Sequence, residues 1–98
     1  MNLNKIKYYI LLLLLTGFSI QLKAEKILIP MDLSQTDHLK AYGIAYWTLK
    51  KEQTVDWLLN YRGGSFMTEY NSLIANECNI RGVLFEVIDE AHASQIYS

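Results

Sequence analysis

The hydrophobic pattern begins with a short apolar run at residues 26–31, KILIPM. Such a run predicts a buried strand, and Pro30 is acceptable near a strand end. Residues 38–51 then place apolar side chains three and four positions apart, which predicts an amphipathic helix. Ser34 and Asp37 are candidate N-caps for it. We expect the side chains at this spacing to pack in the core, and they are Leu39, Tyr42, Tyr46 and Leu49.

The alternation continues to the end of the chain. Residues 55–61, VDWLLNY, predict a second strand, and the Arg-Gly-Gly-Ser turn at residues 62–65 ends it. Residues 66–78 show a 3.6-residue period that predicts a helix capped by Ser65. Residues 82–88 predict a third strand, and residues 89–98 have the caps and spacing of a further helix start.

Strands that alternate with helices of this length predict parallel strands and right-handed crossovers. The expected fold class is therefore α/β, half of a three-layer Rossmann-like or flavodoxin-like fold. Such a half leaves both sheet edges open, so residues 25–98 are interpreted as the N-terminal portion of a larger α/β domain, a truncated fragment. The alternative is a small domain completed by dimerisation. The edges would be covered by the rest of a full-length protein or by a second copy.

Residues 1–24 have the pattern of a secretory signal. Lys5 and Lys7 precede a nearly continuous apolar stretch at residues 8–15, and a more polar segment ends at the small residue Ala24. We expect cleavage near Ala24 and export to the periplasm or the extracellular space. The alternative is an uncleaved anchor, but a spanning helix needs roughly 20 predominantly apolar residues. The only membrane contact expected is through this signal.

Composition narrows the class of protein further. The chain is 51% hydrophobic and has a single cysteine, which excludes a disordered chain and a disulfide-stapled scaffold. The formal net charge is −1, and residues 25–98 keep six of the nine basic residues and all ten acidic ones, giving −4. A mildly acidic domain lacks the positive field that binds nucleic acid, so no nucleic-acid partner is expected.

The candidate ligand-binding residues follow the first two expected strands. They are Asp32, Arg62, Gly63, Gly64 and Ser65. The ends of consecutive parallel strands meet at the ligand-binding edge of an open sheet, and a glycine-rich turn before a helix favours an anion. The sequence therefore predicts a small anionic or carboxylate ligand there. The alternatives are a tight turn that needs positive φ angles and, for Asp32, a helix cap.

No complete catalytic constellation is present. Cys78 with His38 or His92 supplies a nucleophile and a base on paper, but the sequence around Cys78 lacks a nucleophile elbow. The spacing of these residues does not predict a metal site, and no cofactor is expected. Whether the chain belongs to an enzyme stays open. Most of the aromatic residues are expected to be core.

Five stretches carry a resemblance to a known family: KILIPMD, DHLKAYGIAYWTLK, VDWLLNYRGGSFM, ECNIRGV and FEVI, at residues 26–32, 37–50, 55–67, 77–83 and 85–88. They resemble the opening of a family of exported bacterial proteins commonly labelled asparagine synthetase B. Members of that family are longer, which implies that further sequence follows in the whole protein. The label implies glutamine-hydrolysing asparagine synthesis, for which such enzymes use a cysteine after the initiator methionine. Position 2 is Asn2, so the residues argue against that reaction in this segment.

Three hypotheses of function follow. The first is a small-ligand-binding domain that uses the loops after the first two strands. The second is part of an amidotransferase-like or other enzyme whose catalytic groups lie beyond Ser98. The third is a non-catalytic periplasmic or cell-surface interaction module.

Overall fold

The computed structural model describes residues 5–7 and 25–98. Residues 5–7 form a single helical turn. The rest of the predicted export signal, including the cleavage position near Ala24, lies outside the described residues. Among the residues that the structure describes, no helix is long and apolar enough to cross a membrane.

Seven elements follow along residues 25–98. In chain order they are β1 (Lys26–Ile29), α2 (His38–Lys50), β2 (Val55–Leu58), β3 (Ser65–Glu69), α3 (Ser72–Arg81), β4 (Glu86–Ile88) and α4 (Glu90–Tyr97). Helices α2, α3 and α4 each start at a side-chain N-cap, which is an aspartate or an asparagine. Asp37 accepts a hydrogen bond from the Lys40 amide, Asn71 from the Leu73 amide and Asp89 from the His92 amide.

The four strands form one sheet in the order β2-β3-β1-β4, and all three pairings are antiparallel. The predicted parallel, Rossmann-like arrangement is therefore wrong, and the fold is α+β. The reason lies in the chain between β2 and β3. It returns directly as a hairpin, in which Trp57 pairs with Phe66 and Leu58 with Ser65, without a crossover helix.

The error traces to residues 66–78, which were predicted to be one helix. Residues up to Glu69 instead form β3, and the helix begins only at Ser72. Phe66 and Met67 are both buried, on opposite faces of the sheet. A run buried on both faces has no period-2 alternation, so its spacing resembled that of a helix.

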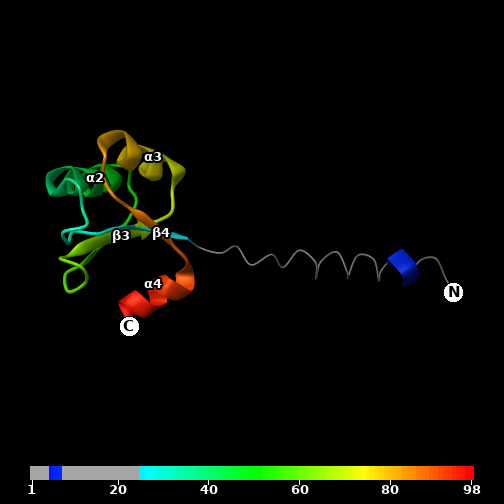
Figure 1. Ribbon diagram of the computed structural model, residues 1–98. Helices are drawn as coiled ribbons and strands as arrows, with labels where there is room; N and C mark the ends of the chain where they lie inside the picture. The colour runs from blue at the N-terminus through cyan, green and yellow to red at the C-terminus, as the bar shows by residue number, and fades with distance from the viewer. Residues whose placement is uncertain (1–4, 8–24) are drawn as a thin grey trace.

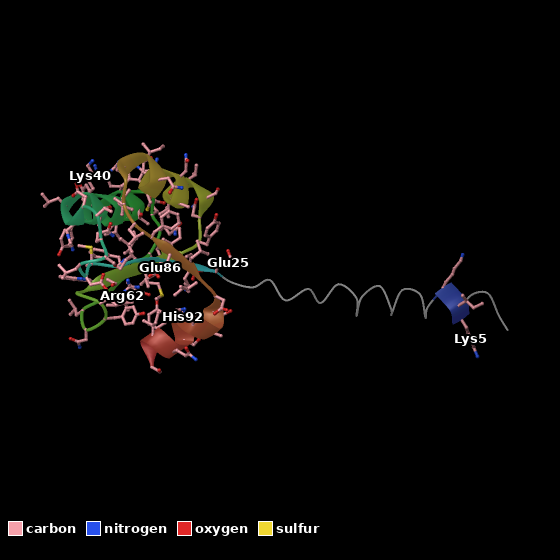
Figure 2. All side chains as sticks on the ribbon, in the orientation of Figure 1. Lys5, Glu25, Lys40, Arg62, Glu86 and His92 are labelled. Carbon is pink, nitrogen blue, oxygen red and sulfur yellow. The ribbon has the colours of Figure 1, made fainter. Side chains whose placement is uncertain are left out.

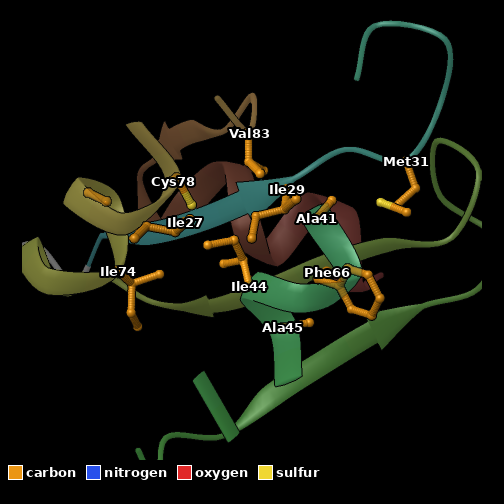
Figure 3. Close-up of a cluster of buried hydrophobic side chains, with 11 residues drawn as sticks. Ile27, Ile29, Met31, Ala41, Ile44, Ala45, Phe66, Ile74, Cys78 and Val83 are labelled. Atoms are coloured by element: carbon orange, nitrogen blue, oxygen red, sulfur yellow. The ribbon is translucent and has the colours of Figure 1, made fainter. Parts of the chain in front are cut away.

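The sheet is the middle one of three layers. In Figure 1, α2 and α3 cover one face and α4 covers the other. The central strand β1 sends Ile27 and Ile29 into the larger core under α2 and α3, which Figure 3 shows, and Leu28 into a smaller core under α4. Apolar side chains on both faces of β1 explain why its sequence is a continuous hydrophobic run.

Helix α2 packs through a different face from the one predicted. The side chains that it buries are Ala41, Ile44, Ala45 and Thr48. The predicted packing stripe of Leu39, Tyr42, Tyr46 and Leu49 is exposed. Small residues let the helix lie close to the sheet, and the Thr48 hydroxyl donates to the Ile44 carbonyl at 2.8 Å, which satisfies its only buried polar group.

Candidate functional site

The predicted ligand-binding residues meet at the end of the sheet where β1 finishes. Asp32 lies just beyond β1, and Arg62 and Gly63 lie in the loop of the β2–β3 hairpin. Glu86, the first residue of β4, lies beside Arg62 (Figure 2). Strands β1 and β2 both pair antiparallel with β3, so they run in the same direction, and the structure brings Asp32 and Arg62, which follow them, into direct contact.

Arg62 is held by side chains of its own chain. Its Nε donates to Asp32 Oδ2 at 2.8 Å, Nη1 donates to a Glu86 carboxylate oxygen, and Nη2 donates to Ser34 Oγ at 3.0 Å. Each of the three guanidinium nitrogens therefore has a partner. Two carboxylates surround one guanidinium, so the cluster carries a net charge of −1, which opposes the approach of an anion.

The ion pair shifts the pKa of both groups. The hydrogen bond from Arg62, followed by the one from Ser34, lowers the pKa of Asp32 to about 2. The hydrogen bond to Asp32 raises the pKa of Arg62 further above its usual value. Asp32 also accepts a hydrogen bond from the Ser34 amide at 3.0 Å, so it is the first residue of an Asx-turn. Asp37, not Asp32, caps α2.

The backbone at Arg62 and Gly63 fixes the loop against the end of β1. The Arg62 carbonyl accepts from the Met31 amide at 3.2 Å, and Arg62 itself has a φ of 43°. At Gly63, where φ is 79°, an added Cβ would lie 2.6 Å from the Met31 carbonyl oxygen. Glycine is therefore required there both by conformation and by close approach.

Gly64 and Ser65 have structural surroundings too. Gly64 has a φ of 90°, and its carbonyl accepts from the Trp57 indole at 2.9 Å. Ser65 is buried in β3 and its hydroxyl donates to the Arg62 carbonyl at 3.1 Å. The prediction that Ser65 caps a helix is wrong, because no helix follows it directly. Asn71 caps α3 instead.

Sequence reasoning missed two residues of this region. Glu86 was assigned only to a strand, and its pairing with Arg62 joins segments 24 residues apart. Gln35 is buried, and its amide donates to the Pro30 and Leu84 carbonyls at 2.8 and 3.0 Å and accepts from the Leu84 amide at 2.8 Å. A glutamine in a polar loop gives no sequence signal of burial.

The cysteine and the histidines do not form a reactive group. Cys78 is buried on α3, and burial raises the pKa of its thiol to about 11. The His38 Nε2 atom lies 3.1 Å from the Met31 carbonyl oxygen and 3.0 Å from that of Asp32. His92 lies on α4, on the other face of the sheet. Within residues 5–7 and 25–98, no three metal-ligating side chains are grouped.

An apolar surface lies where α2 meets β2. Tyr42 contacts Phe66 edge-on with ring centroids 5.6 Å apart, and Trp57 stacks on the same ring at 6.1 Å. Tyr46 and Leu49 follow Tyr42 on its face of α2 at the helical spacing. We call the following residues the α2–β2 apolar surface: Leu39, Tyr42, Tyr46, Leu49 and Trp57, which are exposed by 83, 48, 62, 55 and 57%.

The edge of the sheet next to this surface is open. Among the described residues β2 pairs only with β3, so the backbone groups on its outer side have no strand partner. Its sequence, VDWL, contains no lysine or proline, and its one charged residue, Asp56, accepts a hydrogen bond from the Tyr97 hydroxyl. A shallow hollow of about 300 Å³ lies on the other face of the sheet, between the β2–β3 loop and the end of α4, and no charged side chain lines it.

No protein-family model, no curated protein and no solved structure matches the chain.

Proposed function

We propose that this chain is a non-catalytic interaction domain that binds an extended polypeptide segment at the open edge of β2. The single observation that carries the proposal is the α2–β2 apolar surface, whose five large side chains remain exposed beside an unpaired strand. The partner supplies a strand for β2 and apolar side chains for the exposed face of α2.

Two layers are incomplete on the same side of the molecule. Within residues 25–98 the sheet stops at β2, whose outer backbone groups have no strand partner there, and the helical layer stops at the exposed stripe of α2. Strand addition satisfies the first by main-chain hydrogen bonds, and side chains of the added segment cover the second. Exposed aromatic residues near an interface centre contribute strongly to binding energy.

The Asp32–Arg62 cluster supports this proposal over a small carboxylate ligand. Arg62 would bind such a ligand only after releasing Asp32, Ser34 or Glu86, each already hydrogen bonded to it. The cluster instead fixes the β2–β3 loop on the end of β1, and so positions the edge strand. The cluster therefore affects peptide binding only by holding β2 in place.

The proposed site of action is outside the cytoplasm, on the strength of the signal pattern at residues 1–24. The resemblance to exported proteins labelled asparagine synthetase B agrees with export. Cleavage near Ala24 and membership of that family remain predictions. N-terminal sequencing of the exported product, with Glu25 expected first, checks the cleavage.

A strand peptide tests the proposed function. The probe is an acetylated, amidated heptapeptide that alternates valine and threonine. It is titrated into isotope-labelled protein isolated after expression of the 98-residue chain. We expect amide shift changes at Val55–Leu58 and at the Trp57 indole. A peptide of the same composition without the alternation is the control, because only alternation presents one apolar face.

Matched variants locate the binding. Tyr46→Lys introduces a charge into the α2–β2 apolar surface and should weaken peptide binding at least tenfold. Ile80→Lys makes the same change on α3, where Ile80 is 70% exposed, and should leave the affinity unchanged. Shift changes scattered over the chain, or equal responses to the two peptides, would refute the proposed function.

A further inference from the structure

We infer that the segment bound at β2 is β2 of a second copy of this chain, so that the domain forms a two-fold dimer with a continuous eight-stranded sheet. This inference rests on the proposed function and names its partner. It is carried by three observations: the edge of β2 that no described strand covers, the alternation of side chains between the two faces along β2, and the distribution of charge around α2.

The geometry of β2 suits pairing with itself. A two-fold axis perpendicular to the sheet pairs the strand antiparallel with its copy, so the same patch serves both partners. Side chains directly opposite each other then lie on the same face of the sheet, so a residue must face its own counterpart at the two-fold axis. Near the middle of β2 two residues are able to take that position. Either Asp56 faces Asp56 of the second copy, or Trp57 faces Trp57 of the second copy.

Charge selects between these registers. Two aspartates directly opposite each other are destabilising, whereas an aromatic pair at that position is favourable. With Trp57 at the centre, Val55 faces Leu59 of the second copy, and Asp56 faces Leu58. The Asp56 carboxylate already accepts from the Tyr97 hydroxyl at 2.5 Å, so it has a partner within its own chain.

The helical layer is compatible with the same contact. The exposed stripe of Leu39, Tyr42, Tyr46 and Leu49 carries no charge. The Lys50 ammonium lies over the Tyr46 ring at 5.1 Å from its centroid, and the Lys51 ammonium lies over Trp47 at 5.4 Å. The side chains of the two stripes therefore offer uncharged surface to each other, with the Lys50 ammonium over Tyr46 at its border.

Other occupants fit less well. An anionic lipid surface would be repelled by residues 25–98, whose net charge is −4, and hydrocarbon has no hydrogen-bonding group for the free edge of β2. The opposite edge of the sheet, β4, is only three residues long and begins with Glu86, which is bonded to Arg62. Strand β2 is one residue longer than β4 and adjoins the α2–β2 apolar surface, so β2 is the edge that joins the copies.

Sedimentation velocity across a concentration series tests the inference. The protein isolated after expression of the 98-residue chain should show a reversible monomer–dimer equilibrium. Tyr46→Lys should raise the dissociation constant at least tenfold, and Ile80→Lys should change it less than twofold. A chain that stays monomeric throughout, or an equal effect of Ile80→Lys, would overturn the dimer.

Disulfide trapping tests the register. Trp57→Cys places two thiols directly opposite each other, with Cβ atoms about 4.5–5.5 Å apart. That is close to the roughly 3.5–4.5 Å that a disulfide spans. Leu59→Cys is the control, because the register separates those two thiols along the strands by roughly four residues, about 13 Å. Buried Cys78 does not compete. Rapid trapping at position 57 and slow trapping at position 59 are expected, and the reverse order or no trapping would refute this register.

The strand-peptide titration separates this inference from the proposed function. A chain that stays monomeric but binds the alternating heptapeptide at β2 refutes self-association and leaves strand addition standing. A monomeric chain that binds no peptide refutes both.

Discussion

Gly63→Ala is expected to be the most destabilising single-methyl change in this domain. Gly63 has a φ of 79°, and its ideal Cβ would lie 2.6 Å from the Met31 carbonyl oxygen and 2.9 Å from the carbonyl carbon. Both are backbone atoms at the end of β1, so no flexible side chain is able to move aside. The loop must instead withdraw from β1.

Two contributions determine how much Gly63→Ala lowers the free energy of unfolding. A non-glycine residue in the left-handed region costs roughly 1–2 kcal/mol. Withdrawal of the loop also weakens the 3.2 Å hydrogen bond from the Met31 amide to the Arg62 carbonyl, which contributes about 1 kcal/mol when well formed. The expected loss is therefore about 2–3 kcal/mol, a large fraction of the stability of a small domain, which is about 5–15 kcal/mol.

Gly82→Ala is the matched control. Gly82 caps α3 with a φ of 70°, and an added Cβ there meets nothing within 4 Å, so only the conformational cost applies. The free energy of unfolding of both variants should be measured by urea titration with tryptophan fluorescence and circular dichroism. A Gly63→Ala variant no less stable than Gly82→Ala would show that the loop does not press on the end of β1.

Three further predictions concern polar groups and the thiol. Asp32→Asn should lower the melting temperature at pH 6 but not at pH 2, because Asp32 titrates with a folded pKa of about 2 and its contribution is lost as pH falls from about 4 toward 2. A difference that does not depend on pH would contradict this ion pair. Gln35→Leu should lower the free energy of unfolding by about 2–4 kcal/mol, because it leaves the backbone groups of Leu84 and Pro30 unpaired. An unchanged urea midpoint would show that water replaces the amide. Cys78 should react slowly with a thiol reagent at pH 8 and quickly in urea, since burial raises its pKa to about 11, and equal rates would show an accessible thiol.

The sequence predicted local structure best where a single pattern, such as an apolar run or a capping residue, had no competing interpretation. The apolar run of β1 and the Asp37 cap of α2 both occur as the pattern indicates. The face of α2 was predicted wrongly because two faces of this helix are apolar. The larger side chains, which include Tyr42 and Tyr46, suggested the core, whereas the smaller Ala41 and Ala45 allow the close packing that the sheet requires.

The topology depended on a few residues with competing signals. Residues 65–68 are buried on both faces of the sheet, so they lack the alternation that marks a half-exposed strand, and the predicted helix extended backwards from α3 over residues 66–69. That single misassignment turned a hairpin into a crossover and an antiparallel sheet into a parallel one. The pairing of Arg62 with Glu86 depends on this topology, and the sequence held no signal for it.

Hydrogen exchange measured against chain concentration tests the α2–β2 apolar surface most directly. Amide exchange should be followed by mass spectrometry from about 1 μM to about 1 mM, a range that spans weak to moderate association. Protection of residues 39–59 is predicted to rise at least tenfold at the high end, while protection of Ser72–Arg81 stays constant. Exchange at residues 39–59 that does not change with concentration, or that changes equally in α3, would contradict binding of a second copy at this surface.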